Sequence, residues 1–538
     1  MEMHFATVWE GIADRIGDRP AITQGTTTRT WAQYDDRAAR IAAAFDAAGL
    51  GPDSKVGLFM YNSNEYMEAQ FAAMKIRGVP ININYRYIDE ELWYLLDNSD
   101  SEALVFHSSL GDRVARIVDR LPDVKVFIEV DDGDAGQVSV SQRFEDVVAS
   151  HEPLPRVERS ADDIYMLYTG GTTGMPKGVM YTMGGLTAGL AGSAFPVLGL
   201  PTPEDADGLV DAVAAGADSL VSLPCAPLMH GTGLWLGCFI PHLIGAHVVT
   251  LENRSLDAHE VLETVERHSA WSVTIVGDSF AKPLLAAIDD GKPDGGSYDL
   301  SSVRIMQSSG VMWTTEVKEQ LLDRIEQVML IDAMGSTEGS MGTQISMKGM
   351  STETGKFAQG PNTKVFTDDD RLVEPGSEEI GMVAAGGNVP LGYYKDEEKS
   401  ARTFRTIDGV RYSFPGDLAM VAEDGSLILL GRGSQVINSG GEKIYPEEVE
   451  EAVKRVDGVV DCLVVGVEDE KFGQAVTAVA SVADGVEVAE AAVIDSVKSE
   501  LARYKAPKSV VFVEQVPRAP NGKADYTTAK QVALDALG

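Results

Sequence analysis

Short apolar runs alternate along most of the chain with segments in which apolar residues recur every three or four positions. Near the N-terminus, Val8, Ile12 and Ile16 have the spacing of one helix face. The runs at 55–60 and 103–106 have the length and composition of buried strands. Strands that alternate with helices predict a largely parallel sheet, so the pattern predicts an α/β fold.

The pattern changes in the C-terminal part of the chain, where an acidic amphipathic helix is predicted directly after Pro446. Strands at 461–467, 476–482 and 509–513 and a helix at 493–504 are expected to follow it. This order is typical of a small α+β module. Because 538 residues are too many for one compact core, we expect at least two domains.

Two long stretches, 179–203 and 225–251, contain no Asp, Glu, Lys or Arg and are long enough to span a bilayer. The first contains four glycines and two threonines before Pro196, and the second contains three histidines. We interpret both as interior segments of a large core. A peripheral membrane contact stays open. Segment 201–216 is acidic and rich in Gly and Ala, which predicts a surface excursion.

The charge, the cysteines and the N-terminal sequence limit which partners and which cellular location we expect. A net charge of −37 disfavours nucleic acid and anionic membranes, so we expect no nucleic acid partner. Cys225, Cys238 and Cys462 have neither the pattern of a disulfide framework nor metal-ligand spacing. The N-terminus lacks the basic and then apolar profile of a signal peptide, so a cytoplasmic location is expected.

Segment 168–179 has the clearest chemistry: it consists of Tyr-Thr-Gly-Gly-Thr-Thr-Gly-Met-Pro-Lys-Gly-Val and follows an apolar run. Its glycines permit tight turns, and successive amides of such a loop can form an anion-binding nest. It is not a Walker A loop, because Pro176 precedes the lysine and no Ser or Thr follows it. The segment is predicted to hold a polyphosphate. Its candidate residues are Thr169, Gly170, Gly171, Thr172, Thr173, Gly174 and Lys177.

With these residues and the ordered motifs at 332–338, 412–417, 431–435 and 517–523, the chain resembles adenylate-forming enzymes. This superfamily includes acyl-CoA synthetases, luciferases and peptide-synthetase adenylation domains. The chain most resembles bacterial fatty-acyl-CoA ligases, including actinobacterial ones that act on bulky or sterol side-chain acids. The resemblance implies a large N-terminal α/β domain with mixed and parallel sheets and a distorted β-barrel, then a small mobile C-terminal α+β domain. It also implies ATP, Mg²⁺ and CoA.

The resemblance carries nucleotide-binding roles to individual residues. Thr337 would contact phosphate, Glu338 would hold Mg²⁺, and Asp332 would accept a hydrogen bond from the adenine amino group. Met334 stands where the family usually has an aromatic residue that stacks on adenine, although a thioether can also pack on a ring. Asp417 would accept hydrogen bonds from the ribose hydroxyls.

The last motifs imply a hinge. Arg432 matches the family's arginine that contacts ribose and phosphate, and Ser434 stands at the hinge position, which is usually Asp or Lys. The implied domains are 1–432 and 433–538.

Lys523 matches the family's catalytic lysine, which would bridge the incoming carboxylate and the α-phosphate. An isolated Asn-Gly-Lys turn is usually only a solvated turn, but the ordered motifs before it favour the catalytic role. The resemblance implies that Thr169, Lys177 and Glu338 share in the catalysis with Lys523. Gly440 and Gly441 would line the path of the CoA arm.

The resemblance implies an acyl and CoA site around His230, Trp235, Val276, Gly277 and Gly310. Gly310 is also expected to contact the nucleotide. Taken alone, His230 is better explained as a core histidine, and the two glycines as ordinary turn glycines. The flanking glycines and the family match favour a site role. Amino-acid-activating members of the superfamily have an aspartate near the segment that matches His230, and this chain has none there. The resemblance therefore disfavours an amino acid and implies a fatty acid or a bulky polycyclic acid as the substrate.

Two alternatives stay open: an enzyme that loads a carrier-protein thiol, and a decayed nucleotide-binding sensor. Met334 and Ser434 depart from the family pattern and favour the sensor, whereas the retained charged residues of the motifs favour an enzyme. A homodimer is a further open partner.

Overall fold

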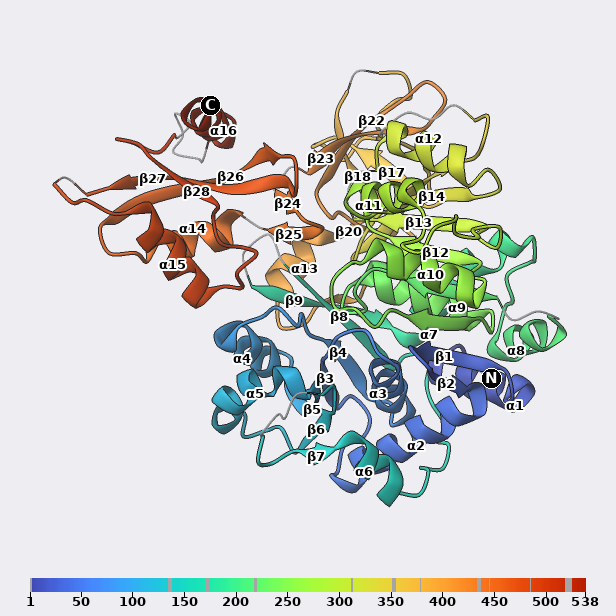
Figure 1. The fold of residues 1–538 in the computed structure, drawn as a ribbon. Helices are drawn as coiled ribbons and strands as arrows, with labels where there is room; N and C mark the ends of the chain where they lie inside the picture. The colour runs from blue at the N-terminus through green and yellow to red at the C-terminus, as the bar shows by residue number, and fades with distance from the viewer. Residues whose placement is uncertain are drawn as a thin grey trace. The chain divides into compact units, whose positions relative to one another are not determined.

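The computed structural model describes residues 2–133, 138–170, 175–216, 220–310, 313–350, 355–377, 379–432, 437–444, 446–483, 485–517 and 525–538. They form two compact units, and Figure 1 labels most of their helices and strands. The larger unit comprises Met1–Tyr85, Leu96–Tyr168 and Gly178–Leu430. The smaller unit comprises Arg86–Leu95, Thr169–Lys177 and Gly431–Gly538.

A long mixed sheet runs through the larger unit (Figure 1). Its parallel part has the order β1 (Pro20–Gln24), β11 (His247–Thr250), β10 (Val221–Pro224), β12 (Ser272–Ile275), β13 (Ile305–Ser309) and β14 (Met329–Ser336). The sheet continues through β15 (Gly339–Ser346), β16 (Lys356–Gln359), β23 (Leu427–Arg432), β22 (Asp417–Val421), β18 (Gly381–Ala385), β21 (Val410–Ser413) and β20 (Phe404–Ile407). The antiparallel strand β2 (Thr27–Thr30) pairs with β1, and β17 (Thr363–Phe366) pairs with β18.

Helices cover both faces of the parallel part. On one face, apolar residues of β10–β14 pack against α10 (Ala258–His268), α11 (Gly277–Asp290) and α12 (Thr315–Arg324). On the other face lie a π-helix (Thr232–Phe239), α9 (Ile240–Leu243), α7 (Met183–Ala194) and α1 (Phe5–Ile16). Neighbouring valines of β11 point to opposite faces of the sheet. Val249 packs on the face covered by α10–α12, and Val248 packs on the face covered by the π-helix and α1.

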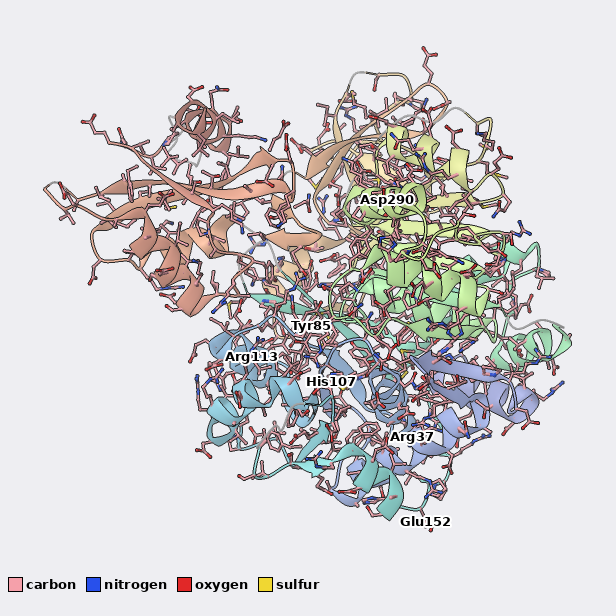
Figure 2. All side chains as sticks on the ribbon, in the orientation of Figure 1. Arg37, Tyr85, His107, Arg113, Glu152 and Asp290 are labelled. Atoms are coloured by element: carbon pink, nitrogen blue, oxygen red, sulfur yellow. The ribbon has the colours of Figure 1, made fainter. Side chains whose placement is uncertain are left out.

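A second, parallel sheet stands beside α2 (Trp31–Ala47), α3 (Asn64–Lys75) and α6 (Phe144–Ser150). Its order is β4 (Val79–Asn82), β3 (Lys55–Phe59), β5 (Ser101–His107), β6 (Val126–Val130) and β7 (Gln142–Arg143). Arg37 on α2, labelled in Figure 2, donates to Glu68 on α3 at 2.7 Å and to Glu145 on α6 at 2.6 Å. Arg29 also lies 3.5 Å from the fully buried Glu68, so removal of Arg37 would leave this carboxylate with one longer ion pair in place of two direct hydrogen bonds.

A third sheet contains β19 (Gly392–Tyr393), β9 (Pro176–Thr182) and β8 (Ile164–Gly170). The remaining helices before residue 430 are α4 (Asp89–Asn98), α5 (Gly111–Ile117), α8 (Ala206–Ala215) and α13 (Glu397–Thr403). Three short 3₁₀ turns occupy Ser108–Leu110, Val118–Arg120 and Pro196–Leu198.

The C-terminal part of the smaller unit has its own two-sided core. Its sheet contains β25 (Glu442–Ile444), β24 (Ile437–Ser439), β27 (Gly473–Val482), β26 (Val459–Asp469) and β28 (Ser509–Phe512). One face packs on α14 (Pro446–Lys454) and α15 (Glu490–Glu500), and the other face packs on α16 (Tyr526–Leu537). Figure 1 shows these helices on opposite sides of β26 and β27.

The predicted fold class is confirmed: a large N-terminal α/β part precedes a small C-terminal α+β part. The excursion predicted at 201–216 contains helix α8, whose start is capped by Asp205 and whose Leu209, Val210 and Val213 are buried. Among the described helices, none is long and apolar enough to cross a membrane.

Candidate functional site

Several of the predicted site residues follow the carboxyl ends of neighbouring strands. β10 leads to the loop with His230, β12 to Val276 and Gly277, β13 to Gly310, and β14 to Glu338. Across the sheet, β11 follows β10 on one side, whereas β13 follows β12 on the opposite side, so the strand order reverses between β10 and β12. Ligands of open α/β sheets bind outside the carboxyl ends of strands at such a switch point. The structure therefore brings these five residues to one edge of the sheet.

The π-helix after His230 packs tightly, through two glycines, against the end of β10 and the loop that follows it. A Cβ at Gly233 would lie 2.3 Å from the Pro227 carbonyl oxygen, and a Cβ at Gly237 would lie 2.5 Å from Pro224 Cβ. The backbone carbonyl of His230 accepts a hydrogen bond from Leu234 N at 2.9 Å. π-Helical turns are rare in proteins, and many of those that occur lie at functional sites. This tendency agrees with the site role predicted for the segment.

Trp235 joins this π-helix to the strand that leads into the glycine-rich segment. Its Nε1 donates to the hydroxyl of Tyr165 on β8 at 3.2 Å. Its ring also meets Tyr181 of β9 edge to face, with centroids 6.0 Å apart. One side of the predicted acyl site is thus held against β8 and β9.

Among the residues that the structure describes, Gly310 leaves open space between β13 and the start of the π-helix. Its φ is +89°, and of these residues only Thr232, through Oγ1 at 3.9 Å, would lie within 4 Å of a Cβ there. Gly277 has a φ of +53°, and its N–H donates to Ser308 Oγ at 2.8 Å. Both positions have left-handed backbone that favours glycine.

Two tyrosines tie the Thr337–Glu338 motif to β9, the strand that contains Lys177. The hydroxyl of Tyr181 on β9 donates to the Thr337 carbonyl oxygen at 2.9 Å. The hydroxyl of Tyr393 on β19 donates to Glu338 Oε1 at 2.8 Å, and Tyr393 pairs with β9 at Val179. Burial and the Glu338 carboxylate raise the pKa of Tyr181 above its ordinary value, so this hydroxyl stays a donor at neutral pH.

Asn82, a residue that the sequence did not single out, anchors two site segments at once. Its Nδ2 donates to the carbonyl oxygen of Tyr168 at 3.0 Å and to that of Met229 at 2.5 Å. Its Oδ1 accepts from Tyr168 N at 2.7 Å. Tyr168 directly precedes Thr169, and Met229 directly precedes His230. The only sequence signal was an Asn inside an apolar run, which does not reveal its partners.

Asp332 lies buried in an ion pair, with its Oδ2 2.7 Å from Nζ of the buried Lys318. Burial raises the pKa of Asp332 above its usual value, and the Lys318 ammonium opposes this rise. Met334 is buried with Met341 and Phe357 in an apolar cluster. The adenine contacts expected of Asp332 and Met334 therefore stay predictions.

Asp417 begins β22 and is buried directly after Gly416, whose φ is +96°.

In the smaller unit, Gly440 and Gly441 form the turn between β24 and β25 with φ of +58° and +85°. Thr169 and Gly170 end β8, and Lys177 lies in β9. Gly171, Thr172, Thr173, Gly174, Ser434 and Lys523 lie outside the described residues, as does the side chain of Arg432.

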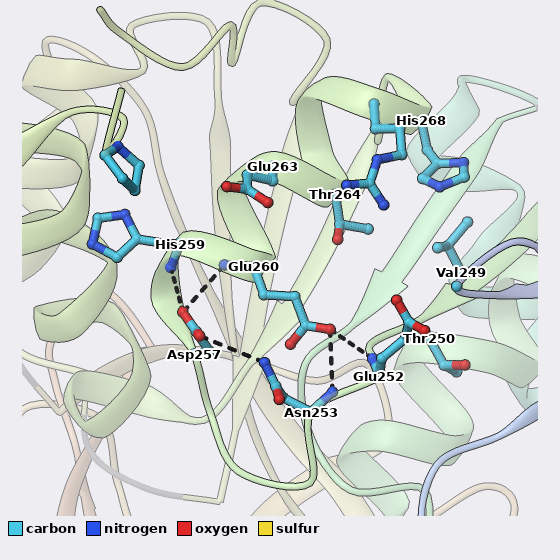
Figure 3. Close-up of a pocket in the computed structure, with 13 residues that line it drawn as sticks. Val249, Thr250, Glu252, Asn253, Asp257, His259, Glu260, Glu263, Thr264 and His268 are labelled. Atoms are coloured by element: carbon cyan, nitrogen blue, oxygen red, sulfur yellow. Dashed lines mark hydrogen bonds between the residues drawn. The ribbon is translucent and has the colours of Figure 1, made fainter. Parts of the chain in front are cut away.

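A cavity of about 660 Å³ is formed by other residues: Gly25, the end of β11 and the loop after it, α10 along its length and Pro293. Figure 3 shows the residues that line it. Asp257 caps α10, and Glu260 Oε1 accepts from the backbone N–H groups of Glu252 and Asn253. None of the predicted site residues that the structure describes lines this cavity.

Comparison with known proteins places this geometry in context. The family described as AMP-binding enzyme matches residues 9–394, and its C-terminal domain matches residues 448–523. A 3-oxocholest-4-en-26-oate–CoA ligase from Rhodococcus rhodochrous is 40% identical, over 98% of this chain and 96% of the relative. A medium/long-chain-fatty-acid–CoA/3-oxocholest-4-en-26-oate–CoA ligase from Mycolicibacterium smegmatis is also 40% identical, over 99% of this chain and 97% of the relative. The solved structure of an amide bond synthetase from Marinactinospora thermotolerans shares the fold, with a TM-score of 0.78 and 23% sequence identity. The match covers 98% of this chain and 99% of the synthetase.

Proposed function

This chain belongs to the family of AMP-binding enzymes, and we propose that it joins an apolar carboxylic acid to CoA in two steps. The carboxylate of the acid attacks the α-phosphorus of ATP, which gives an acyl-adenylate and releases pyrophosphate. The thiol of CoA then attacks the acyl carbon, which gives acyl-CoA and releases AMP. One observation carries the proposal: Tyr181 and Tyr393 bind the Thr337–Glu338 motif to the strand that contains Lys177.

In this proposal, segment 169–177 holds the β- and γ-phosphates through its backbone amides, its threonines and Lys177. Glu338 suits Mg²⁺, because Tyr393 occupies one lone pair of its Oε1 and a carboxylate offers several. When bound, Mg²⁺ would neutralise charge on the phosphates. Thr337 contacts a phosphate oxygen in the same arrangement.

Lys523 would bridge the incoming carboxylate and the α-phosphate, where negative charge accumulates. Loss of such a donor typically costs about 3–4 kcal/mol of transition-state stabilisation. Asp417 and Arg432 would hold the ribose, and Asp332 and Met334 would contact the adenine. These roles follow the family pattern residue by residue.

The acid would lie at the carboxyl edge of β10, β12 and β13, among His230, Trp235, Val276, Gly277 and Gly310. The two 40%-identical relatives act on fatty and sterol side-chain acids by their names, which favours a medium or long fatty acid or a bulky polycyclic acid here. The open space at Gly310 fits a large acid.

We further propose two domains, 1–432 and 433–538, with a hinge at Ser434. The C-terminal domain would present Lys523 for adenylate formation and the Gly440–Gly441 turn for thioester formation. A cytoplasmic location, a transient membrane contact for uptake of the acid and a homodimer belong to the same proposal. The three cysteines are buried free thiols, which suits a reducing compartment.

The test is pyrophosphate release from the purified protein with Mg·ATP and apolar acids of increasing size, with and without CoA. We expect release that peaks at one acid size and turns over repeatedly only with CoA. Lys523→Ala should slow pyrophosphate release by about a hundred- to a thousandfold. It should slow thioester formation from preformed acyl-adenylate much less.

Two other outcomes would overturn parts of this proposal. Release that stops after one equivalent even with CoA would point to a carrier-protein thiol as the acceptor. Absence of release with every acid, despite measurable ATP binding, would favour a nucleotide-binding sensor.

A further inference from the structure

Gln307 is a polar residue on the face of β13 that lies under the π-helix. Its Nε2 donates to the Leu236 carbonyl oxygen at 2.9 Å and to Thr274 Oγ1 at 3.0 Å. Because a carbonyl oxygen can only accept, the amide nitrogen must face Leu236, and this fixes the orientation of the amide. Both N–H groups are thereby used. Within the part of the chain that the structure describes, Oε1 of Gln307 has no hydrogen-bond donor.

Gln307 has a polar neighbour on one side and an apolar one on the other. Gln307 stands between Thr274 of β12 and Ile331 of β14 in the sheet register. Gln307, Leu236 and Ile331 are all partly exposed, although they lie between the sheet and a helix. Three residues further along the chain, Gly310 leaves the open space described above. Gln307 therefore presents a fixed acceptor beside the region where the acyl chain is proposed to lie.

We propose that Oε1 of Gln307 accepts a hydrogen bond from a hydroxyl group on the acyl chain, so that the preferred substrates are hydroxylated apolar acids. This inference rests on the proposed acyl-CoA ligase function. A ketone at the same carbon cannot donate, and it would place a second acceptor against Oε1.

The expected preference follows from desolvation. An unsubstituted alkyl chain would displace water from Oε1 and offer no donor in return. Sites that pair with a substrate hydroxyl reject analogues that lack it far more strongly than apolar pockets reject an extra methylene. Because Oε1 is only partly buried, we expect a moderate ratio of kcat/KM, about tenfold to a hundredfold, in favour of the matched hydroxy acid.

The experiment uses the full-length protein with straight-chain acids of one length. The series contains the unsubstituted acid, acids with a hydroxyl at each successive carbon, and the keto acid that matches the best hydroxy acid. Wild-type kcat/KM should show a maximum at one hydroxyl position, above both the unsubstituted and the keto acid. Gln307→Met should bring these ratios close to one. Ser309→Ala is the matched control, because Ser309 Oγ on the same strand donates to the Ala333 carbonyl oxygen and should not affect the ratios.

Several results would overturn the inference. One is a wild-type enzyme that prefers the unsubstituted acid to every hydroxy acid. Another is a positional maximum that Gln307→Met leaves intact. The comparison of hydroxy and keto acids on the wild type needs no variant, so it decides the question even if Gln307→Met does not fold. No turnover of any acid would instead contradict the proposed function itself.

Discussion

Among the residues that the structure describes, only the hydroxyl of Tyr393 donates to Glu338 Oε1, at 2.8 Å. Tyr393→Phe keeps the buried ring and removes only this donor. Loss of a hydrogen bond to a charged group typically costs about 1.5–3 kcal/mol. We therefore expect kcat/KM for Mg·ATP to fall about tenfold to a hundredfold, with a small change in the thermal midpoint. Steady-state pyrophosphate release and a thermal melt measure both quantities.

The next residue provides the control. The hydroxyl of Tyr394 donates to the exposed Asp100 at 2.6 Å, away from Glu338. Tyr394→Phe should leave kcat/KM for Mg·ATP unchanged. Equal losses in the two variants would contradict a specific role of Tyr393.

At the scale of elements, the end of β4 positions two loops through Asn82. Asn82→Ala would leave the backbone N–H and carbonyl of Tyr168 and the carbonyl of Met229 without their side-chain partner. Each buried group left unsatisfied costs about 1–3 kcal/mol. Because Tyr168 and Met229 precede two different site segments, we expect the KM values for ATP and for the acid to rise together. Initial rates with each substrate varied in turn measure this effect at a temperature where the variant is folded.

Two variants sharpen the test of Asn82. Asn82→Asp keeps the acceptor for Tyr168 N but places a carboxylate against two carbonyl oxygens, so it should be at least as damaging as alanine. Asn388→Ala removes an exposed asparagine that donates to the Gly185 carbonyl oxygen, and it should change neither KM. A rise in only one KM for Asn82→Ala would argue against a shared anchor.

Elements differ in how well the sequence predicts them. The periodic spacing of Val8, Ile12 and Ile16 correctly predicts α1 (Phe5–Ile16), because the same face is buried in the structure. Helix α8 was not predicted, because small residues and acids dominate its segment and its few apolar residues give a weak pattern. The π-helix was not predicted either, since its tight packing depends on glycines that meet β10 and the following loop only after folding.

At the scale of the whole molecule, the order of the motifs along the chain predicted more of the candidate site than the local pattern of apolar residues did. The turns with His230, Gly277, Gly310 and Glu338 are far apart in the sequence, yet parallel strand order brings them to one edge of the sheet. Residues that act through long-range contacts could not be predicted in this way. Asn82 and Met229, for example, are 147 positions apart, and no local signal links them.

The pH dependence of stability is a property of the whole larger unit, because burial lowers the pKa of several histidines in it. The pKa of His107 and of His247 is about 4, and that of His242 is about 3. An unfolded chain has a histidine pKa of about 6.5. Between these values the unfolded chain binds protons that the folded chain does not, so the free energy of unfolding falls as the pH falls. Each histidine contributes a slope of up to about 1.4 kcal/mol per pH unit.

His242→Gln should therefore reduce the acid sensitivity of the fold. His242 is completely buried, and its Nε2 lies 3.3 Å from the Ala21 carbonyl oxygen, which an amide N–H can also approach. The variant is expected to have a lower thermal midpoint than the wild type above about pH 7, where the histidine contribution is constant. The difference should narrow as the pH falls from about 6.5 towards 4, because the variant no longer takes up a proton on unfolding. Thermal melts of both proteins across this range measure the difference, and a gap that stays constant with pH would contradict the role of His242.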